Sequence, residues 1–297
     1  MLETPADPGA GNTTLTAILA ACPLRAKVTD NITYCGQWRD YDLQGEAAWF
    51  HLIGAGECWI EMRGLRDRLH LRAGDFIIFP QGNAHSLCGR DGARSDDFTT
   101  VICGELHFTP STRNPLREGL PDVVVAREKE VGPAFRHLGE LLCAECHRKE
   151  AGSQAVLDKL AEALFAMALR QFLISGTDRR GLLAALADPR LAKALAAMHA
   201  QPGRDWTVAE LAGIAAMSRT AFAEQFAAVV GESPIHHLTR WRMLQAQKLL
   251  ADPRKSVTAV AQELGYQTEA AFRRRYKEVL GHGPGQTRRA ARVARRT

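Results

Sequence analysis

The C-terminal third of this chain contains one pattern twice, and that repeat limits what the chain can fold into. A shift of 50 residues superposes Ala209 on Ala259, Ile214 on Leu264, Ala215 on Gly265, Ser218 on Thr268, Phe222 on Phe272, Phe226 on Tyr276, Gly231 on Gly281 and Pro234 on Pro284. The small, aromatic, glycine and proline positions recur in one order. We therefore expect one short structure to form twice, joined by a helix over residues 234–250.

Each copy of the pattern predicts a helix-turn-helix. The first helix ("TVAELAGIAA" or "VTAVAQEL") ends at small residues, where the chain can turn sharply. Ser218 or Thr268 then offers a side-chain oxygen to the first amides of the second helix. Aromatic residues four positions apart anchor that helix, glycine ends it and proline begins the next. Its opposite face stays free to enter a DNA major groove. An ordinary helical bundle could explain one copy, but two copies in register favour the helix-turn-helix.

The segments "WTVAELAGIAAMSRTAFAEQFAAVVGESP", "PIHHLTRWRMLQAQKLL" and "SVTAVAQELGYQTEAAFRRRYKEVLGHGP" resemble the DNA-binding domain of AraC/XylS regulators. In that family, two recognition helices on one rigid linking helix enter successive major grooves. The resemblance implies DNA contacts from Arg219, Thr220, Glu224, Gln267, Glu269, Arg273 and Arg274. Arginine is the usual reader of guanine, and glutamate can accept from cytosine. The chain departs from the family at Gly283 and Thr287, which affects only the last helix.

Positive charge is concentrated in the same region. Residues 201–297 contain 16 Lys and Arg against 8 Asp and Glu, a net charge of +8, whereas the remainder of the chain carries −3. A basic surface gains affinity for a phosphate backbone through counterion release. A solvated basic face without a partner is the simpler alternative, so the charge supports the repeat and does not replace it.

Composition indicates a soluble globular protein, since 46% of the 297 residues are hydrophobic and 24% are charged. No apolar run reaches the roughly 18 residues of a membrane span. The opening "MLETPADPGAGNTT" does not resemble a secretory signal, so we expect a loose leader over 1–14 and a cytoplasmic protein. Its seven cysteines, an odd number, are expected to be free thiols.

The first half of the chain has a different texture. Short β-rich runs ("AWFHLI", "CWIEM", "RLHL", "DFIIFP", "TTVICGELHF") alternate with turn residues over 31–108 and predict an antiparallel barrel or sandwich. The run "VLDKLAEALFAMALRQFLI" then predicts an amphipathic helix, either a dimerisation surface or simple packing within the chain. The following "SGTDRRG" is expected to be a linker.

Two spaced motifs in the β-rich region resemble those of cupins. The second cupin motif is matched in "GDFIIFPQGNAH" at Gly74, Pro80, Gly82 and His85. The first is matched upstream at Gly45, His51, Glu57 and Gly64. Ile53 replaces a usual histidine ligand, and Gly89 replaces the usual asparagine. The resemblance implies a small antiparallel β-barrel with His51, Glu57 and His85 near its mouth or interior.

Imidazole and carboxylate ligands of this kind could hold a divalent ion and leave an open coordination position. A cupin enzyme usually keeps the fourth ligand, and this chain lacks it. The alternative is a barrel that has lost its metal and serves as a sensor. We therefore expect no catalytic residues and no required cofactor, with a divalent metal at His51, Glu57 and His85 left open.

Three segments, "TYCGQWRDYD", "LRAGDFIIFPQGNAHSL" and "VICGELHF", resemble AraC-type regulators that respond to hypochlorous acid and other reactive chlorine species. That resemblance implies that Cys35 and Cys103 oxidise as a pair, to a disulfide, and so alter DNA binding. An accessible thiolate reacts with an oxidant and a second thiol can resolve the product. Both cysteines lie in expected strands, where a buried inert thiol is the common alternative.

Together these patterns predict an α+β multidomain chain: a cupin-like sensor domain over 15–125, a helical dimerisation or coupling segment and linker over 126–180, and an all-α DNA-binding domain over 188–297. We expect a non-enzymatic, sequence-specific transcription regulator, most simply an activator. Its expected partners are double-stranded promoter DNA, RNA polymerase and a second copy of the chain, with no membrane. A regulator that senses a small organic ligand or metal, and a cupin enzyme fused to a DNA-binding domain, are the alternatives.

Overall fold

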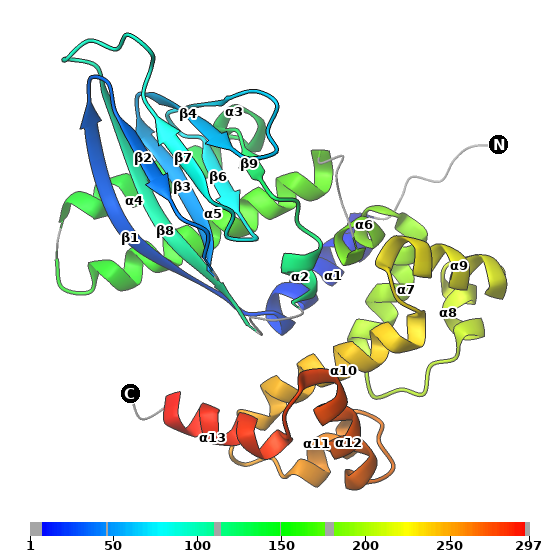
Figure 1. Ribbon diagram of the computed structural model, residues 1–297. Coiled ribbons are helices and arrows are strands. Elements are labelled where there is room, and N and C mark those ends of the chain that lie inside the picture. The colour runs from blue at the N-terminus through cyan, green and yellow to red at the C-terminus, as the bar shows by residue number, and fades with distance from the viewer. Residues whose placement is uncertain (1–7, 46, 110–113, 149, 176–180, 295–297) are drawn as a thin grey trace. The chain divides into compact units, whose positions relative to one another are not determined.

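The computed structural model describes residues 8–45, 47–109, 114–148, 150–175 and 181–294 and contains two compact units (Figure 1). The cupin unit spans Pro23–Arg179, and the helical unit combines Met1–Cys22 with Arg180–Thr297. The expected loose leader is wrong from residue 8 onward, because α1 (Pro8–Ala21) forms there and packs on α7 (Pro189–Ala200). Burial of the apolar side chains of Leu15 and Ile18 explains why this segment forms an ordered helix.

Two antiparallel sheets build the cupin unit. The larger has the strand order β1-β8-β3-β6-β9 and the smaller the order β2-β7-β4-β5. The strands are β1 (Leu24–Cys35), β2 (Arg39–Asp42), β3 (Ala48–Ala55), β4 (Glu57–Met62), β5 (Leu69–Arg72), β6 (Phe76–Phe79), β7 (His85–Cys88), β8 (Phe98–Phe108) and β9 (Val124–Ala126). The five expected β-rich runs correspond to β3, β4, β5, β6 and β8. No β-rich run was expected at β1, β2, β7 or β9.

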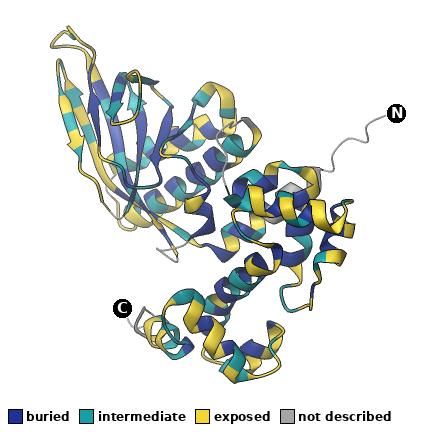
Figure 2. Cartoon of the chain, turned by 45° about the vertical axis from the view of Figure 1, so that its right-hand side comes forward, coloured by how far each residue is buried: buried dark blue, intermediate teal, exposed yellow. Residues whose placement is uncertain are grey.

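The two sheets face each other across an apolar core. Ile53, Ile77 and Val101 come from the larger sheet. They meet Ile60 and Leu87 from the smaller one, and all five are buried. Figure 2 shows buried residues along the strands of the cupin unit. Alternation along each strand sends every second side chain into this layer. The expected antiparallel cupin fold is therefore confirmed, but as two separate facing sheets: no ladder among the described strands closes them into the expected barrel. Polar side chains on the inner faces of the sheets are enclosed.

Helices cover the other face of the larger sheet. α4 (Pro133–Arg148) and α5 (Ser153–Ser175) are the long ones, preceded by the short α2 (Pro115–Glu118) and α3 (Glu128–Val131). Phe165 on α5 meets Phe108 edge-on, with ring centroids 5.9 Å apart. The amphipathic helix expected from the sequence is confirmed as α5. Of the expected linker "SGTDRRG", residues 176–180 lie outside the described residues.

The helical unit contains both expected helix-turn-helix motifs. Its remaining helices are α6 (Gly181–Ala187), α8 (Val208–Ile214), α9 (Arg219–Val230), α10 (Pro234–Leu250), α11 (Val257–Glu263), α12 (Glu269–Leu280) and α13 (Pro284–Ala294). Ser218 accepts a hydrogen bond from the amide of Ala221 at 3.2 Å and so caps α9. Gly231 ends α9 in the left-handed region, at φ 87°. Thr268 and Gly281 do the same for α12, so the capping predicted from the repeat is confirmed.

One detail of the repeat differs from the expected 50-residue shift. The turn is closed by the amide of Met217 bonding the carbonyl of Ala212 in the first unit, and by Tyr266 bonding Ala261 in the second. These pairs are 49 positions apart, as are the capping residues Thr207 and Ser256. The second unit thus has one extra residue in its turn. Small residues on both sides of the turn made the two alignments indistinguishable in the sequence.

The turn residue in the left-handed region is Ala216 in the first unit, at φ 53°, and Gly265 in the second, at φ 81°. Alanine in this region costs roughly 1–2 kcal/mol, and glycine does not incur this cost. We expect Ala216→Gly to raise the free energy of unfolding by about 0.5–1 kcal/mol, after the entropy of glycine is subtracted. Urea unfolding of the full chain measures this. The matched control Ala215→Gly, at a right-handed buried position, should destabilise. If both variants changed the free energy of unfolding equally, the backbone strain assigned to Ala216 would be contradicted.

A buried histidine pair fastens α7 to α10. The Nε2 atoms of His199 and His237 lie 3.0 Å apart, and Nδ1 of His237 lies 3.0 Å from Oε1 of Glu232. His199 also stacks on Trp241 at 3.6 Å. Burial, reinforced by His237, holds the pKa of His199 well below its ordinary value. Burial also lowers the pKa of His237, against the opposing effect of Glu232.

Both rings are therefore neutral in the folded unit, whereas the unfolded chain protonates them near pH 6.5. Because the folded-state pKa values are depressed, this stabilisation is complete above pH 6.5 and declines as the pH falls below it. We expect a loss of about 1 kcal/mol per ring for each pH unit below 6.5. Urea unfolding between pH 7.5 and pH 5.5 tests this, and His199→Gln should flatten the slope. An unchanged slope in that variant would refute the assignment.

Candidate functional site

The second helix of the first helix-turn-helix, α9, has one buried and one exposed face. Phe222 and Phe226 are fully buried. Arg219, Thr220 and Glu224 are exposed. Arg219 forms no hydrogen bond or ion pair within the described chain. The aromatic anchors thus fix which side of α9 is presented outward, as expected from the sequence.

In the second motif, α12 repeats this arrangement. Phe272 and Tyr276 are fully buried, whereas Arg273 and Arg274 are exposed. Gln267 is exposed in the preceding turn. The hydroxyl of Tyr276 lies 2.6 Å from that of Thr287 on α13. Thr287, where the family has an aromatic residue, is thereby used to dock the last helix.

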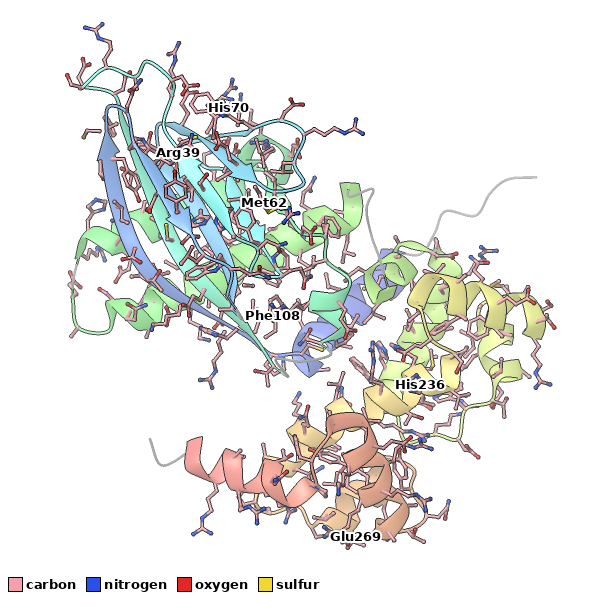
Figure 3. All side chains as sticks on the ribbon, in the orientation of Figure 1. Arg39, Met62, His70, Phe108, His236 and Glu269 are labelled. Atoms are coloured by element: carbon pink, nitrogen blue, oxygen red, sulfur yellow. The ribbon has the colours of Figure 1, made fainter. Side chains whose placement is uncertain are left out.

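Glu269, labelled in Figure 3, lies at the start of α12. It accepts a hydrogen bond from the Thr258 hydroxyl on α11, and its Oε1 lies 2.6 Å from Nε of Arg273. These bonds, from Thr258 first and then Arg273, lower the pKa of the Glu269 carboxyl. Glu269 therefore orients Arg273. Because its carboxylate is already bonded within the chain, Glu269 is less available than Arg274 for contacts outside the chain. Among the described residues, Arg274 has no ionic partner.

The linking helix α10 makes the two motifs one piece. Met243, Ala246 and Leu250 of α10 are buried against α11 and α12. At the other end of α10, His237 meets the ring of Phe226 edge-on at 5.7 Å. Both ends of one helix are thus packed into the two motifs, as Figure 1 also shows. The two exposed helix faces are consequently held at a fixed spacing.

A second polar cluster lies inside the cupin unit. His51 on β3 and His85 on β7 have fully buried side chains, and their Nε2 atoms are 2.7 Å apart. Oδ2 of Asp42 on β2 lies 3.4 Å from Nε2 of His51 and 3.3 Å from Nε2 of His85. Burial, and then the neighbouring His85, lowers the pKa of His51 to about 3. The ring is therefore neutral at neutral pH, with a lone pair available.

The expected ligand set is corrected at one position. His51 and His85 meet as expected, but Glu57 does not join them. Its carboxylate instead pairs with His70 on β5, at 2.8 Å. Asp42 takes the place of Glu57 beside the two histidines. Asp42 lies directly opposite His85 in the β2–β7 ladder, and no motif in the sequence predicted this pairing.

The other nitrogen of each ring is also engaged. Nδ1 of His85 lies 2.9 Å from the carbonyl oxygen of Asn83. Nδ1 of His51 lies 3.1 Å from Sγ of Cys103 on β8. Cys103 is half-buried, and burial, followed by the Asp42 charge, raises the pKa of its thiol. The cluster thus joins both sheets through four side chains.

The structure does not bring Cys35 and Cys103 together. In the β1–β8 ladder Cys35 is opposite Phe98, and Cys103 is opposite Asp30. Five residues separate Phe98 from Cys103, about 17 Å along the strand. An odd separation also places the two thiols on opposite faces of the sheet. A disulfide requires Cα atoms within about 7 Å, so this conformation excludes the expected Cys35–Cys103 bond.

None of the helices in the described ranges combines the length and apolar character needed to cross a membrane.

Comparison with known proteins matches both units. Residues 14–173 match the family model Cupin, and residues 211–290 match the model Helix-turn-helix domain. An uncharacterized HTH-type transcriptional regulator of Haemophilus influenzae is 30% identical, over 90% of this chain and 95% of its own. The RCS-specific HTH-type transcriptional activator RclR of Escherichia coli is 28% identical, over 82% and 84%.

Among solved structures, the DNA-binding domain of AdpA, in complex with a target DNA, is 33% identical with a TM-score of 0.34. The match covers 36% of this chain and 96% of the AdpA chain. The Haemophilus influenzae and Escherichia coli relatives are named as transcription regulators, and the residues matched by the two family models include both sheets and both helix-turn-helix motifs. The chain therefore belongs to the AraC-like family of DNA-binding, helix-turn-helix transcription regulators that carry an N-terminal cupin domain.

Proposed function

We propose that this chain activates transcription by placing α9 and α12 in successive major grooves of promoter DNA. One observation carries the proposal: α9 and α12 both pack on α10 through a buried face, and each presents a matching exposed face. The proposed DNA contacts are Arg219, Thr220, Glu224, Gln267, Arg273 and Arg274, with Glu269 orienting Arg273. The net charge of +8 over residues 201–297 would supply the affinity for phosphate that does not depend on sequence.

The proposed regulator acts as a homodimer that contacts RNA polymerase. Leu141 on α4 and Val156 on α5 are large apolar side chains, 57% and 46% exposed. They lie on the helical layer of the cupin unit, where a second copy could cover them. We therefore propose that residues 126–180 have the dimerisation role predicted from the sequence.

We expect Arg274→Ala and Arg219→Ala each to weaken binding to the chain's own upstream promoter DNA by about 5- to 100-fold, the value of one base-reading arginine. Relaxed base preference should appear at two positions about 10 base pairs apart. Fluorescence anisotropy with single-base operator variants measures both effects. The control is Arg275→Ala, whose guanidinium is paired with Glu278 at 2.9 Å. A loss equal to that of Arg274→Ala would argue against selective reading.

For the signal, we propose an oxidant such as hypochlorous acid, with Cys35 as the first thiol to react. Cys35 is exposed and Cys103 is shielded, and oxidants select accessible thiols. The thiol and hypochlorous acid give a sulfenic acid and hydrogen chloride. A second thiol then displaces water to form a disulfide. Because the two thiols occupy opposite faces, this second step would require β1 to separate from β8, which would alter the cupin unit.

We expect a brief, roughly equimolar pulse of hypochlorous acid to modify Cys35 before Cys103, and hydrogen exchange in β1 to rise as the disulfide forms. Peptide mass spectrometry of the full chain maps both events. Cys103→Ser should stop the reaction at the sulfenic acid, and Cys35→Ser should abolish the response in promoter binding. A full response in Cys35→Ser, or a disulfide without increased exchange in β1, would contradict the proposal.

A further inference from the structure

We propose that Asp42, His51 and His85 form a binding site for one divalent transition-metal ion, in which Asp42 replaces the glutamate of the cupin motif. The site belongs to the cupin unit and does not depend on DNA binding or on cysteine oxidation. Two imidazole nitrogens and one carboxylate oxygen are ligands that suit zinc, iron, cobalt and related ions.

The distances between the ligand atoms fit one shared ion. The two Nε2 atoms are 2.7 Å apart, and Oδ2 of Asp42 is 3.3 and 3.4 Å from them. An ion about 2.0–2.2 Å from each ligand needs donor atoms separated by roughly 2.8–3.1 Å at octahedral angles and roughly 3.3–3.6 Å at tetrahedral angles. A triangle of this size accepts such an ion with little movement of the side chains. With three protein ligands, at least one coordination position remains open to water or to a signal molecule.

The second nitrogen of each ring supports the same assignment. The Asn83 carbonyl can only accept, so Nδ1 of His85 carries the hydrogen and Nε2 presents its lone pair to the centre of the cluster. Nδ1 of His51 also has a partner on the far side of its ring, Sγ of Cys103 at 3.1 Å; with an ion on Nε2, Nδ1 would carry the hydrogen and the sulfur would accept it. Metal-binding histidines are usually oriented through their other nitrogen by such a partner. In addition, Phe79 stacks on His85 at 3.6 Å and fixes its plane.

Charge also favours a cation. Asp42 is a largely covered carboxylate, with 27% of its side chain exposed. Within the described ranges it pairs only with the two histidines, and no lysine or arginine reaches it. A covered carboxylate with no cationic Lys or Arg side chain beside it lacks charge compensation, and a divalent ion would supply it. Because Asp42 ends β2, an edge strand of the smaller sheet, its exposed part gives the ion a route inward.

Glu57 provides the matched control. It is an acidic residue of the same unit and occupies the family's ligand position, yet it pairs with His70 at 2.8 Å. A site formed by the usual motif would depend on Glu57, and the proposed site depends on Asp42. Asp42→Asn and Glu57→Gln each remove one carboxylate charge while keeping the size of the side chain. The two variants therefore separate the two assignments.

The test is zinc binding to the full chain after chelator treatment, measured by competition with a chromogenic chelator and by metal analysis. We expect one tight site per chain in the unaltered protein and in Glu57→Gln, and at least 100-fold weaker binding in Asp42→Asn. His51→Gln should abolish the site. Thermal unfolding without metal should show that Asp42→Asn and Glu57→Gln remain folded. If His51→Gln does not fold, the comparison of the two carboxylate variants still decides.

Cobalt substitution adds a spectroscopic readout. Visible bands of a nitrogen- and oxygen-ligated ion are expected without a thiolate charge-transfer band, because Cys103 faces the far side of the His51 ring. A thiolate band would overturn the assignment of ligands. The proposal is also overturned if the unaltered chain binds no stoichiometric ion, if Asp42→Asn binds zinc as tightly, or if Glu57→Gln loses the site. In the first case the two histidines form only a hydrogen-bonded pair.

Discussion

Burial of paired aromatic side chains against the core around α10 determines the geometry of the helical unit. A fully buried aromatic ring contributes roughly 2–3 kcal/mol, and each recognition helix carries two. Phe222 with Phe226, and Phe272 with Tyr276, leave α9 and α12 only one orientation each. That orientation also fixes the direction of the arginine side chains, since they occupy the exposed face of each helix. Because α10 contributes to both cores, the spacing of the two exposed faces is set by one helix.

The cupin unit depends on a different constraint, which is the cost of burying polar groups. Within the described part of its inner layer, polar side chains gather where Asp42, His51, His85 and Cys103 meet. Buried polar groups are stable only when they are hydrogen-bonded or bind an ion. Each histidine uses one nitrogen for a protein partner and directs the other toward Asp42. This arrangement makes the cluster the most chemically distinctive part of the unit, and it joins the two sheets directly.

Much of the architecture followed from local patterns in the sequence. The capping serine and threonine, the glycine ends and the aromatic spacing predicted both helix-turn-helix motifs. The alternating apolar runs predicted five of the strands. Strands β1, β2, β7 and β9 were missed by these runs, and the loose leader was predicted where α1 forms, because these segments are ordered by partners distant in the chain. The one-residue difference in the turns was missed because neighbouring small residues permit either alignment.

The sequence by itself determined the two helix-turn-helix motifs, the basic charge beside them and the presence of His51 and His85 in a β-rich cupin domain. Those features depend on helical or strand periodicity and on short spacings. Only the tertiary structure decided that Asp42 rather than Glu57 meets the histidines, because a cross-strand partner is set by register and not by spacing. Register likewise separated Cys35 from Cys103: five positions along one ladder put two thiols on opposite faces of a sheet.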